Sequence, residues 1–234
     1  MTLNIPGYIK RANIENAPID YAWTEEATEF LGEERLANRI RPICPRGIVA
    51  LTTGFAEWVA WRLHNGLNDP ILLDYIEAAW AGIIDWRYLK ARKSVPGAPY
   101  YLKDWTGTTR GAVIQTCNFL DEVIRGAQEG MGAGLSAASL SQLALYVMPS
   151  PKPFKEWRRF AIGRLAALYP EAEEGDIGPP IPREVLDPEF EYKPEMADDL
   201  LRNFLQSLDS EQNPFLASPK EMITEGFPGT PYNF

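Results

Sequence analysis

Cysteine and histidine are scarce in this chain. Among its 234 residues there are two cysteines, Cys44 and Cys117, and one histidine, His64. Two cysteines cannot build a disulfide framework, nor the cysteine and histidine set of a structural zinc site. A single histidine excludes sites with several histidine ligands, and any Ser-His-Asp triad would depend on His64 alone. We therefore expect no metal and no cofactor, and we interpret Cys117 as a buried free thiol.

Long hydrophobic runs are also missing. No stretch reaches the ~18 uninterrupted apolar residues that a membrane-spanning helix needs. The N-terminal stretch MTLNIPGYIKRANIENAPIDY lacks the apolar segment of a secretory signal. We therefore expect a cytoplasmic protein with no membrane partner.

Patterns typical of β-strands are rare. Apolar and polar residues seldom alternate, whereas three- and four-residue spacing of apolar residues is common. We predict an all-α fold, a compact bundle of about six to seven helices. One helix is predicted to begin at Thr24, as its N-cap, and to end before Pro42. The others are predicted at 46–65, 70–91, 109–125, 136–148, 152–169 and 194–208.

Charge is distributed unevenly along the chain. Residues 1–169 carry 17 acidic and 19 basic side chains, whereas residues 170–234 carry 15 acidic and four basic ones, with ten of the 20 prolines. A disordered tail normally lacks aromatic residues. The aromatic residues of this segment are Phe190, Tyr192, Phe204, Phe215, Phe227, Tyr232 and Phe234. We therefore expect a helical body, 1–169, and an acidic, proline-rich strap, 170–234, which packs on it within one domain.

The predicted helix at 46–65 belongs to a tryptophan-rich region. Residues 54–89 contain four of the seven tryptophans. One arc of the helix is apolar and consists of Ile48, Leu51, Phe55, Trp58 and Val59. Glu57, Trp61 and His64 lie together on the opposite side. A helix that is apolar or aromatic on most of its surface is typical of the centre of a bundle.

Glu57 and His64 allow two interpretations. As an enzyme site, they would form an acid–base pair two helical turns apart, with Arg62 holding an anion, although Arg62 lies on the other face. Alternatively, His64 ends the helix, because the helix-stop signal Asn65-Gly66 follows it. We favour the second interpretation.

Three arginines lie at the edges of predicted apolar faces. Arg62, Arg87 and Arg164 either extend to solvent along those faces or pair with Glu57, Glu77 or Asp121 in a buried network. Structural pairing is the more common role of such groups, and the chain has no Glu-x-x-His pattern of a di-iron bundle.

Basic and aromatic residues occur together in the stretch from Arg87 to Arg110. Such a stretch can bind single-stranded nucleic acid, because bases stack on aromatic rings and phosphates pair with cations. It can equally receive the acidic strap of its own chain. We favour docking of the strap or a solvated face, and we do not expect a nucleic-acid partner.

These observations favour a protein that binds another protein and is not an enzyme. We expect a bacterial inhibitor of the immunity-protein type, which neutralises a basic toxin or effector, since acidic surfaces speed association with basic partners. The predicted contact residues are Glu171, Glu173, Glu174, Asp176, Glu189, Glu191, Asp198 and Asp199. Alternatives are an enzyme that uses Glu57, His64 and Arg62, and a scaffold subunit of a phage or secretion apparatus. A homo-oligomer is also considered.

Overall fold

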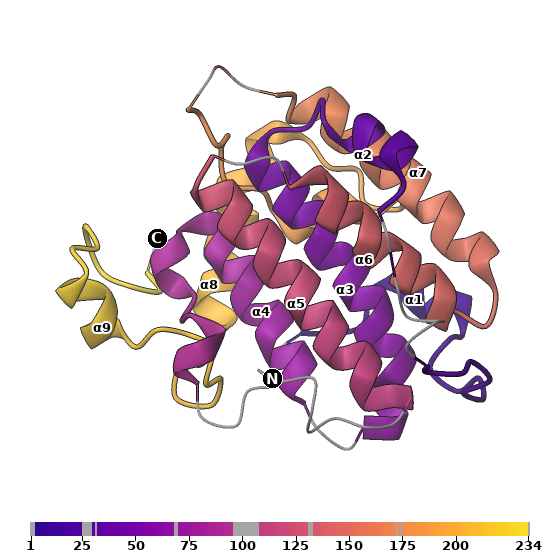
Figure 1. Ribbon diagram of the computed structural model, residues 1–234. Coiled ribbons are helices and arrows are strands. Elements are labelled where there is room, and N and C mark those ends of the chain that lie inside the picture. Colours follow the sequence, from indigo (N-terminus) through magenta and orange to yellow (C-terminus); the bar gives the residue numbers. More distant parts are fainter. Residues whose placement is uncertain are drawn as a thin grey trace.

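The predicted all-α class is confirmed by a computed structural model of the chain (Figure 1). The structure describes residues 3–24, 30, 32–67, 70–95, 108–130, 133–171, 173 and 175–233. Within these ranges the chain forms nine α-helices, and its extended pairings are two isolated β-bridges. None of the described helices is long and apolar enough to cross a membrane.

The connections between the helices range from a few residues, as between α6 and α7, to more than 20, as between α7 and α8. Their bounds are α1 Gly7–Ala12, α2 Glu34–Ile40, α3 Pro45–Leu67, α4 Ile71–Ile84, α5 Thr108–Gln128, α6 Gly134–Val147, α7 Pro151–Leu168, α8 Ala197–Ser207 and α9 Pro219–Thr224. In Figure 1, α5 and α6 lie side by side, and α2 lies against α7. The helices predicted at 109–125, 136–148, 152–169 and 194–208 correspond to α5, α6, α7 and α8.

Helix α3 is the centre of the bundle, as its composition predicts. It packs against α4, α5, α6 and α7, and its side chains are buried around almost the whole circumference. Gly54 permits a close approach of two neighbouring side chains. A Cβ at this position would lie 2.7 Å from Leu186 Cδ1 and 3.0 Å from Trp157 Cη2. Glycine is therefore required where the side chains of α7 and of the segment around Leu186 meet the central helix.

The helix predicted to begin at Thr24 begins instead at Glu34. Thr24 lies outside any helix, and the residues 25–29 and 31 lie outside the described part of the chain. Tertiary packing explains the difference, because Trp23 lies over Gly111 of α5 and contacts the ring of Phe30. The Tyr146 hydroxyl also donates to the carbonyl of Ala22, 2.5 Å away. These contacts outweigh the helical preference of the local sequence.

The helix predicted at 70–91 is shorter, because it ends at Ile84. Asp85 is extended and is the N-cap of the 3-10 turn Trp86–Tyr88. Its carboxylate accepts a hydrogen bond from the backbone N–H of Arg87 in this turn. Leu89 then forms a β-bridge with Leu216. Residues 85–91, which were predicted to continue the helix, therefore leave it, and Leu89 among them pairs with the C-terminal part of the chain.

The residues after Pro170 contribute side chains to the same buried cluster as the residues before it. Ile181, Val185, Leu186, Phe215 and Met222 are all buried there. Two short helices, α1 and α9, had not been predicted. For α9 a signal was present, since Ser218 and Glu221 form the reciprocal hydrogen bonds of a capping box.

Candidate functional site

Glu57 is buried at the centre of the bundle and is fully paired. Its carboxylate accepts from Arg183 Nε at 2.7 Å and Arg183 Nη2 at 2.9 Å, and from Trp80 Nε1 at 2.6 Å. Arg183 begins the 3-10 turn Arg183–Leu186, which packs on α3 and α7. This geometry joins a late segment of the chain to the central helix, and it leaves Glu57 in a structural ion pair.

Arg62 is also buried, with 1% of its surface exposed. Its guanidinium donates to the carbonyl of Val147 at 3.0 Å and to those of Ile14, Ala17 and Pro18 at 3.2, 2.6 and 2.5 Å. Burial lowers the pKa of Arg62, although Tyr21 and Asp20 favour its charged form. The side chain therefore holds the loop after α1 and the end of α6 against α3, and it is not placed to bind an anion.

His64 lies apart from Glu57. Its ring contacts Trp61, with 5.2 Å between centroids, and no hydrogen bond or ion pair joins it to Glu57 among the described residues. Helix α3 continues beyond His64 to Leu67, because the side chain of Asn65 bonds to Glu15 and Asn16 and does not end the helix. The structure does not bring Glu57, Arg62 and His64 into one site.

Glu57, Glu77 and Asp121, the acids expected to pair with Arg62, Arg87 or Arg164, have other partners in the structure. Glu57 pairs with Arg183, Asp121 pairs with Arg92 at 3.0 Å, and Glu77 accepts from Asn213 at 2.9 Å. Arg87 pairs with its neighbour Asp85 at 2.5 Å. Arg164 donates to the carbonyls of Val185, Asp187 and Phe190.

The first part of the basic, aromatic stretch receives the C-terminal residues of the same chain. Lys90 pairs with Glu221 at 3.0 Å, and Arg87 lies 4.9 Å above the ring of Phe227. The ring of Tyr88 packs edge-on against Phe227 and Tyr232. Bonds from Ser218 and Lys90 lower the pKa of Glu221 to about 2. Residues 96–107 of the stretch lie outside the described residues.

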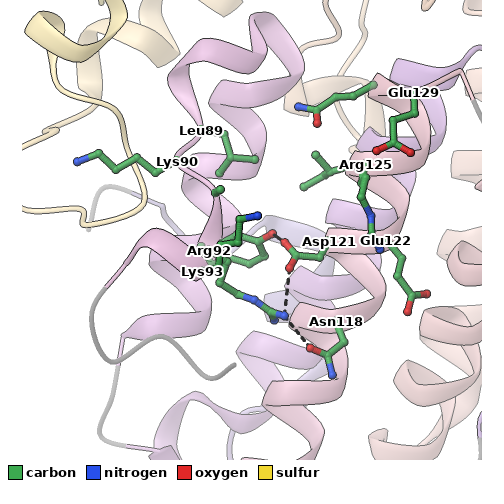
Figure 2. Close-up of a pocket in the computed structure, with 13 residues that line it drawn as sticks. Leu89, Lys90, Arg92, Lys93, Asn118, Asp121, Glu122, Arg125 and Glu129 are labelled. Atoms are coloured by element: carbon green, nitrogen blue, oxygen red, sulfur yellow. Dashed lines mark hydrogen bonds and ion pairs between the residues drawn. The ribbon is translucent and has the colours of Figure 1, made fainter. Parts of the chain in front are cut away.

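A polar cavity of about 560 Å³ lies between this stretch and α5 (Figure 2). Arg92 Nη2 donates to Asn118 Oδ1 at 2.7 Å and pairs with Asp121 Oδ2. Tyr75 of α4 donates to the other oxygen of Asp121. Figure 2 shows the side chain of Arg92 directed toward Asn118 and Asp121, whereas Lys90 extends away from them.

Burial determines the electrostatics of this cavity. It raises the pKa of Asp121, although Arg92 and the hydroxyl of Tyr75 act in the opposite direction. The pKa of Tyr75 is also raised, first by burial and then by Asp121. A partly buried carboxyl group that has a raised pKa and accepts a hydrogen bond from a tyrosine is a candidate for acid–base chemistry. The spacing of Asn118 and Asp121 on one helix face was visible in the sequence, but the position of Arg92 was not.

A second cavity of about 340 Å³ has mainly aromatic walls. It lies where α1 meets α7, and its lining residues are Tyr8, Arg11, Ala12, Trp58, Pro153, Glu156, Trp157, Phe160 and Pro188. Tyr8 and Trp157 stack with 5.4 Å between centroids and 13° between planes. No signal in the sequence joined α1 to α7, since the two helices are far apart along the chain.

The acids predicted to contact a partner are exposed wherever the structure describes them. They are Glu171, Glu173, Asp176, Glu189, Glu191, Asp198 and Asp199. Glu174 lies outside the described residues. Glu189 pairs with Arg11, Glu191 with Lys193 and Asp199 with Arg202. They lie on three separate stretches of the segment, and no group of three or more potential metal ligands occurs among the described residues.

Comparisons of the chain with protein-family models, with curated proteins and with solved structures give no match.

Proposed function

We propose that this protein binds a basic protein partner through the exposed carboxylates of residues 171–199, in the manner of an inhibitor that neutralises a toxin or effector. In this proposal, residues 170–234 are a strap that presents acidic side chains on a helical support. The observation that carries the proposal is how residues 171–190 are attached, because their contacts to the body leave the carboxylates outside.

The attachment uses backbone groups and inward side chains. The backbone N–H of Glu171 donates to Pro42, and Arg46 donates from its backbone to Ile177 and from its side chain to Gly178. Further along, Trp157 donates to the carbonyl of Leu186 at 2.8 Å. These contacts fix the path of the chain without using its exposed acids.

Fixed acidic side chains suit recognition of a basic partner for two physical reasons. Holding the chain in place before binding lowers the entropy that association must overcome. A surface with one sign of charge speeds the encounter with a partner of opposite sign. The −11 balance of residues 170–234 supplies such a surface, beside a body that is nearly neutral.

The test begins with the partner, which is captured from the native cell and identified by mass spectrometry. Association rates are then measured for the native chain and for a variant with Glu171→Gln, Glu173→Gln and Asp198→Asn. No other described side chain forms a hydrogen bond or ion pair with these three. The association rate should fall severalfold while the dissociation rate changes little, because exposed charges act mainly on encounter.

A matched control removes the same charge elsewhere, with Asp20→Asn, Glu211→Gln and Glu225→Gln. All three control residues are exposed and lie outside residues 171–199. The native rate should fall as salt rises from 0.1 to 1 M, because the Debye length shrinks from about 10 Å to about 3 Å. Equal effects of the two triple variants would contradict recognition by this segment.

A second candidate function is supported by the Asp121 cavity. There the carboxyl group of Asp121, with a raised pKa, contacts Tyr75 and Arg92. The cavity around it, of about 560 Å³, has the size of a small-molecule site. Thermal-shift screening of small carboxylates, phosphates and amines would test it, with Asp121→Asn as the comparison. A compound that stabilises the native chain and fails to stabilise this variant would support a small-molecule site. The candidate would be rejected if no compound separated the two proteins.

A further inference from the structure

The aromatic cavity at the junction of α1 and α7 is built from one face of α7. Pro153, Glu156, Trp157 and Phe160 follow the three- and four-residue spacing of a helix face, and all four line the cavity. Tyr8 of α1 stacks on Trp157, and Trp58 of α3 lies 6.0 Å from Tyr8. Rings from three helices therefore line an open cavity of about 340 Å³.

Aromatic rings attract cations to their faces, and planar guanidinium groups stack on them especially well. The rings of α7 already do this within the molecule. The guanidinium of Arg164 lies 4.5 Å from the ring centroid of Phe160, and that of Arg158 lies 5.8 Å from the ring centroid of Phe154. Phe160, which lines the cavity, therefore already accepts an arginine in this structure, and so does Phe154, a ring of α7 outside the lining.

Carboxylates stand at the rim of the cavity. Glu156 belongs to the lining, and Glu189 follows the lining residue Pro188. Glu189 pairs with Arg11, also a lining residue, at 2.6 Å. Both side chains of this pair are largely exposed, at 61% and 51%, and exposed ion pairs contribute little to stability. A second guanidinium can therefore replace Arg11 at Glu189 at low cost.

We propose that the aromatic cavity receives an arginine side chain of the basic partner. The guanidinium stacks on the ring of Phe160 and takes the place of Arg11 at Glu189, while the alkyl part of the side chain contacts the prolines and Tyr8. The origin of this arginine in a protein partner rests on the proposed function, but recognition of a guanidinium by the cavity can be tested separately. Buried aromatic pockets that hold an arginine are typical centres of protein interfaces.

The first test uses two peptides, Ac-Gly-Arg-Gly-NH2 and its citrulline counterpart, which has the same shape without the charge. Binding is followed by tryptophan fluorescence and by NMR shifts of the Trp157 side chain, with titration into the millimolar range. The arginine peptide should bind, and the citrulline peptide should bind several times more weakly. Equal binding of the two peptides, or no binding of either, would overturn the proposal.

The ring of Phe160 is tested with two substitutions. Phe160→Leu keeps an apolar wall but removes the π face, and Phe160→Ala removes both. Each substitution should weaken the binding of the arginine peptide on the order of three- to tenfold, because a cation–π contact is lost. Arg164 still donates to Val185 and Asp187 in both variants, so the wall remains attached. Native affinity in Phe160→Leu would show simple apolar packing and would refute a guanidinium site.

Arg11 supplies the decisive measurement. Arg11→Gln removes the cation that competes for Glu189, so the arginine peptide should bind about two- to fivefold more tightly. Unchanged or weaker binding in this variant would show that Arg11 does not compete with the peptide for Glu189 and would overturn the proposal. The two proposals can fail separately. If the arginine peptide binds as expected while the triple variant Glu171→Gln, Glu173→Gln and Asp198→Asn associates with the partner at the native rate, the arginine site is supported and the proposed function is rejected. Loss of peptide binding alone would leave the acidic surface as the recognition element.

Discussion

Arg62 was a candidate anion-binding residue in the sequence, but in the structure it stabilises the fold. It lies inside an apolar arc, and its guanidinium gathers four backbone carbonyls from two regions of the chain. Carbonyls without donors inside a protein are costly, so the arginine completes the hydrogen bonding of the loop at 14–18. A cation in a helix core can thus be directed entirely to the backbone.

Replacing Arg62 should therefore lower the free energy of unfolding. We expect Arg62→Met to cost about 3 kcal/mol, because several buried carbonyls lose their donor at once. Urea denaturation followed by circular dichroism measures the change. His64→Ala is the comparison on the same helix, with an expected change of within about 0.5 kcal/mol. A larger loss for His64→Ala than for Arg62→Met would contradict this account of α3.

The Glu57–Arg183 pair should behave as a buried ion pair. Arg183→Met leaves the carboxylate of Glu57 without its strongest partner, so we expect a loss of about 3–5 kcal/mol. The double variant with Glu57→Gln should recover part of this loss, since it removes the uncompensated charge. A double-mutant cycle in urea measures the coupling. Strictly additive losses would mean that the two residues act independently.

At the scale of single elements, α9 is held by one carboxylate with two tasks. Glu221 completes the capping box with Ser218 and also pairs with Lys90. Its pKa is lowered from the ordinary 4.5 to about 2. A lowered carboxylate pKa stabilises the folded state above pH 4.5, and this stabilisation is lost as the pH falls towards 2.

Glu221→Gln should therefore destabilise the protein at neutral pH, and its difference from the native chain should shrink between pH 4.5 and 2. Thermal unfolding across this range measures the difference. Glu225→Gln, which changes an exposed acid just after α9, serves as the control and should show no such convergence. A constant difference down to pH 2 would show that the charge of Glu221 is not involved.

How far the sequence predicts this structure depends on where each element gets its stability. Helix α5 and helix α7 follow from apolar spacing, because each buries one continuous face. The non-helical conformation at Thr24 is explained by the packing of Trp23 against α5, which local patterns do not reveal. The sequence identified Asp121 as an acid in need of a partner. It could not identify Arg92, whose position depends on the bridge between Leu89 and Leu216.

At the scale of the whole molecule, one buried cluster includes residues from both sides of Pro170. A chain ending at residue 169 would lose Arg183, Leu186 and Phe215, and would expose Glu57 and Trp157. We expect this shortened chain to lack a cooperative unfolding transition, because a buried charge and several buried rings lose their partners together. Urea titration and the dispersion of its NMR spectrum provide the measurement.

The full chain should correspondingly unfold in one step. Fluorescence and circular dichroism should give the same midpoint in urea. Two separate transitions, or a shortened chain with native-like NMR dispersion, would show that the helical body folds without the residues after 170.

The large sequence separation of Glu57 and Arg183 also determines when this contact can form during biosynthesis. The two residues are 126 positions apart, so the ribosome has to extend the chain by 126 residues after Glu57 before Arg183 is made. During that interval the emerging chain carries a carboxylate at its centre that has not yet met its guanidinium. Translation proceeds at about 5–20 residues per second, so this state lasts several seconds or more. The core therefore cannot be completed before Arg183 has been made, and nascent chains that stop before Arg183 are poor candidates for release in a native form.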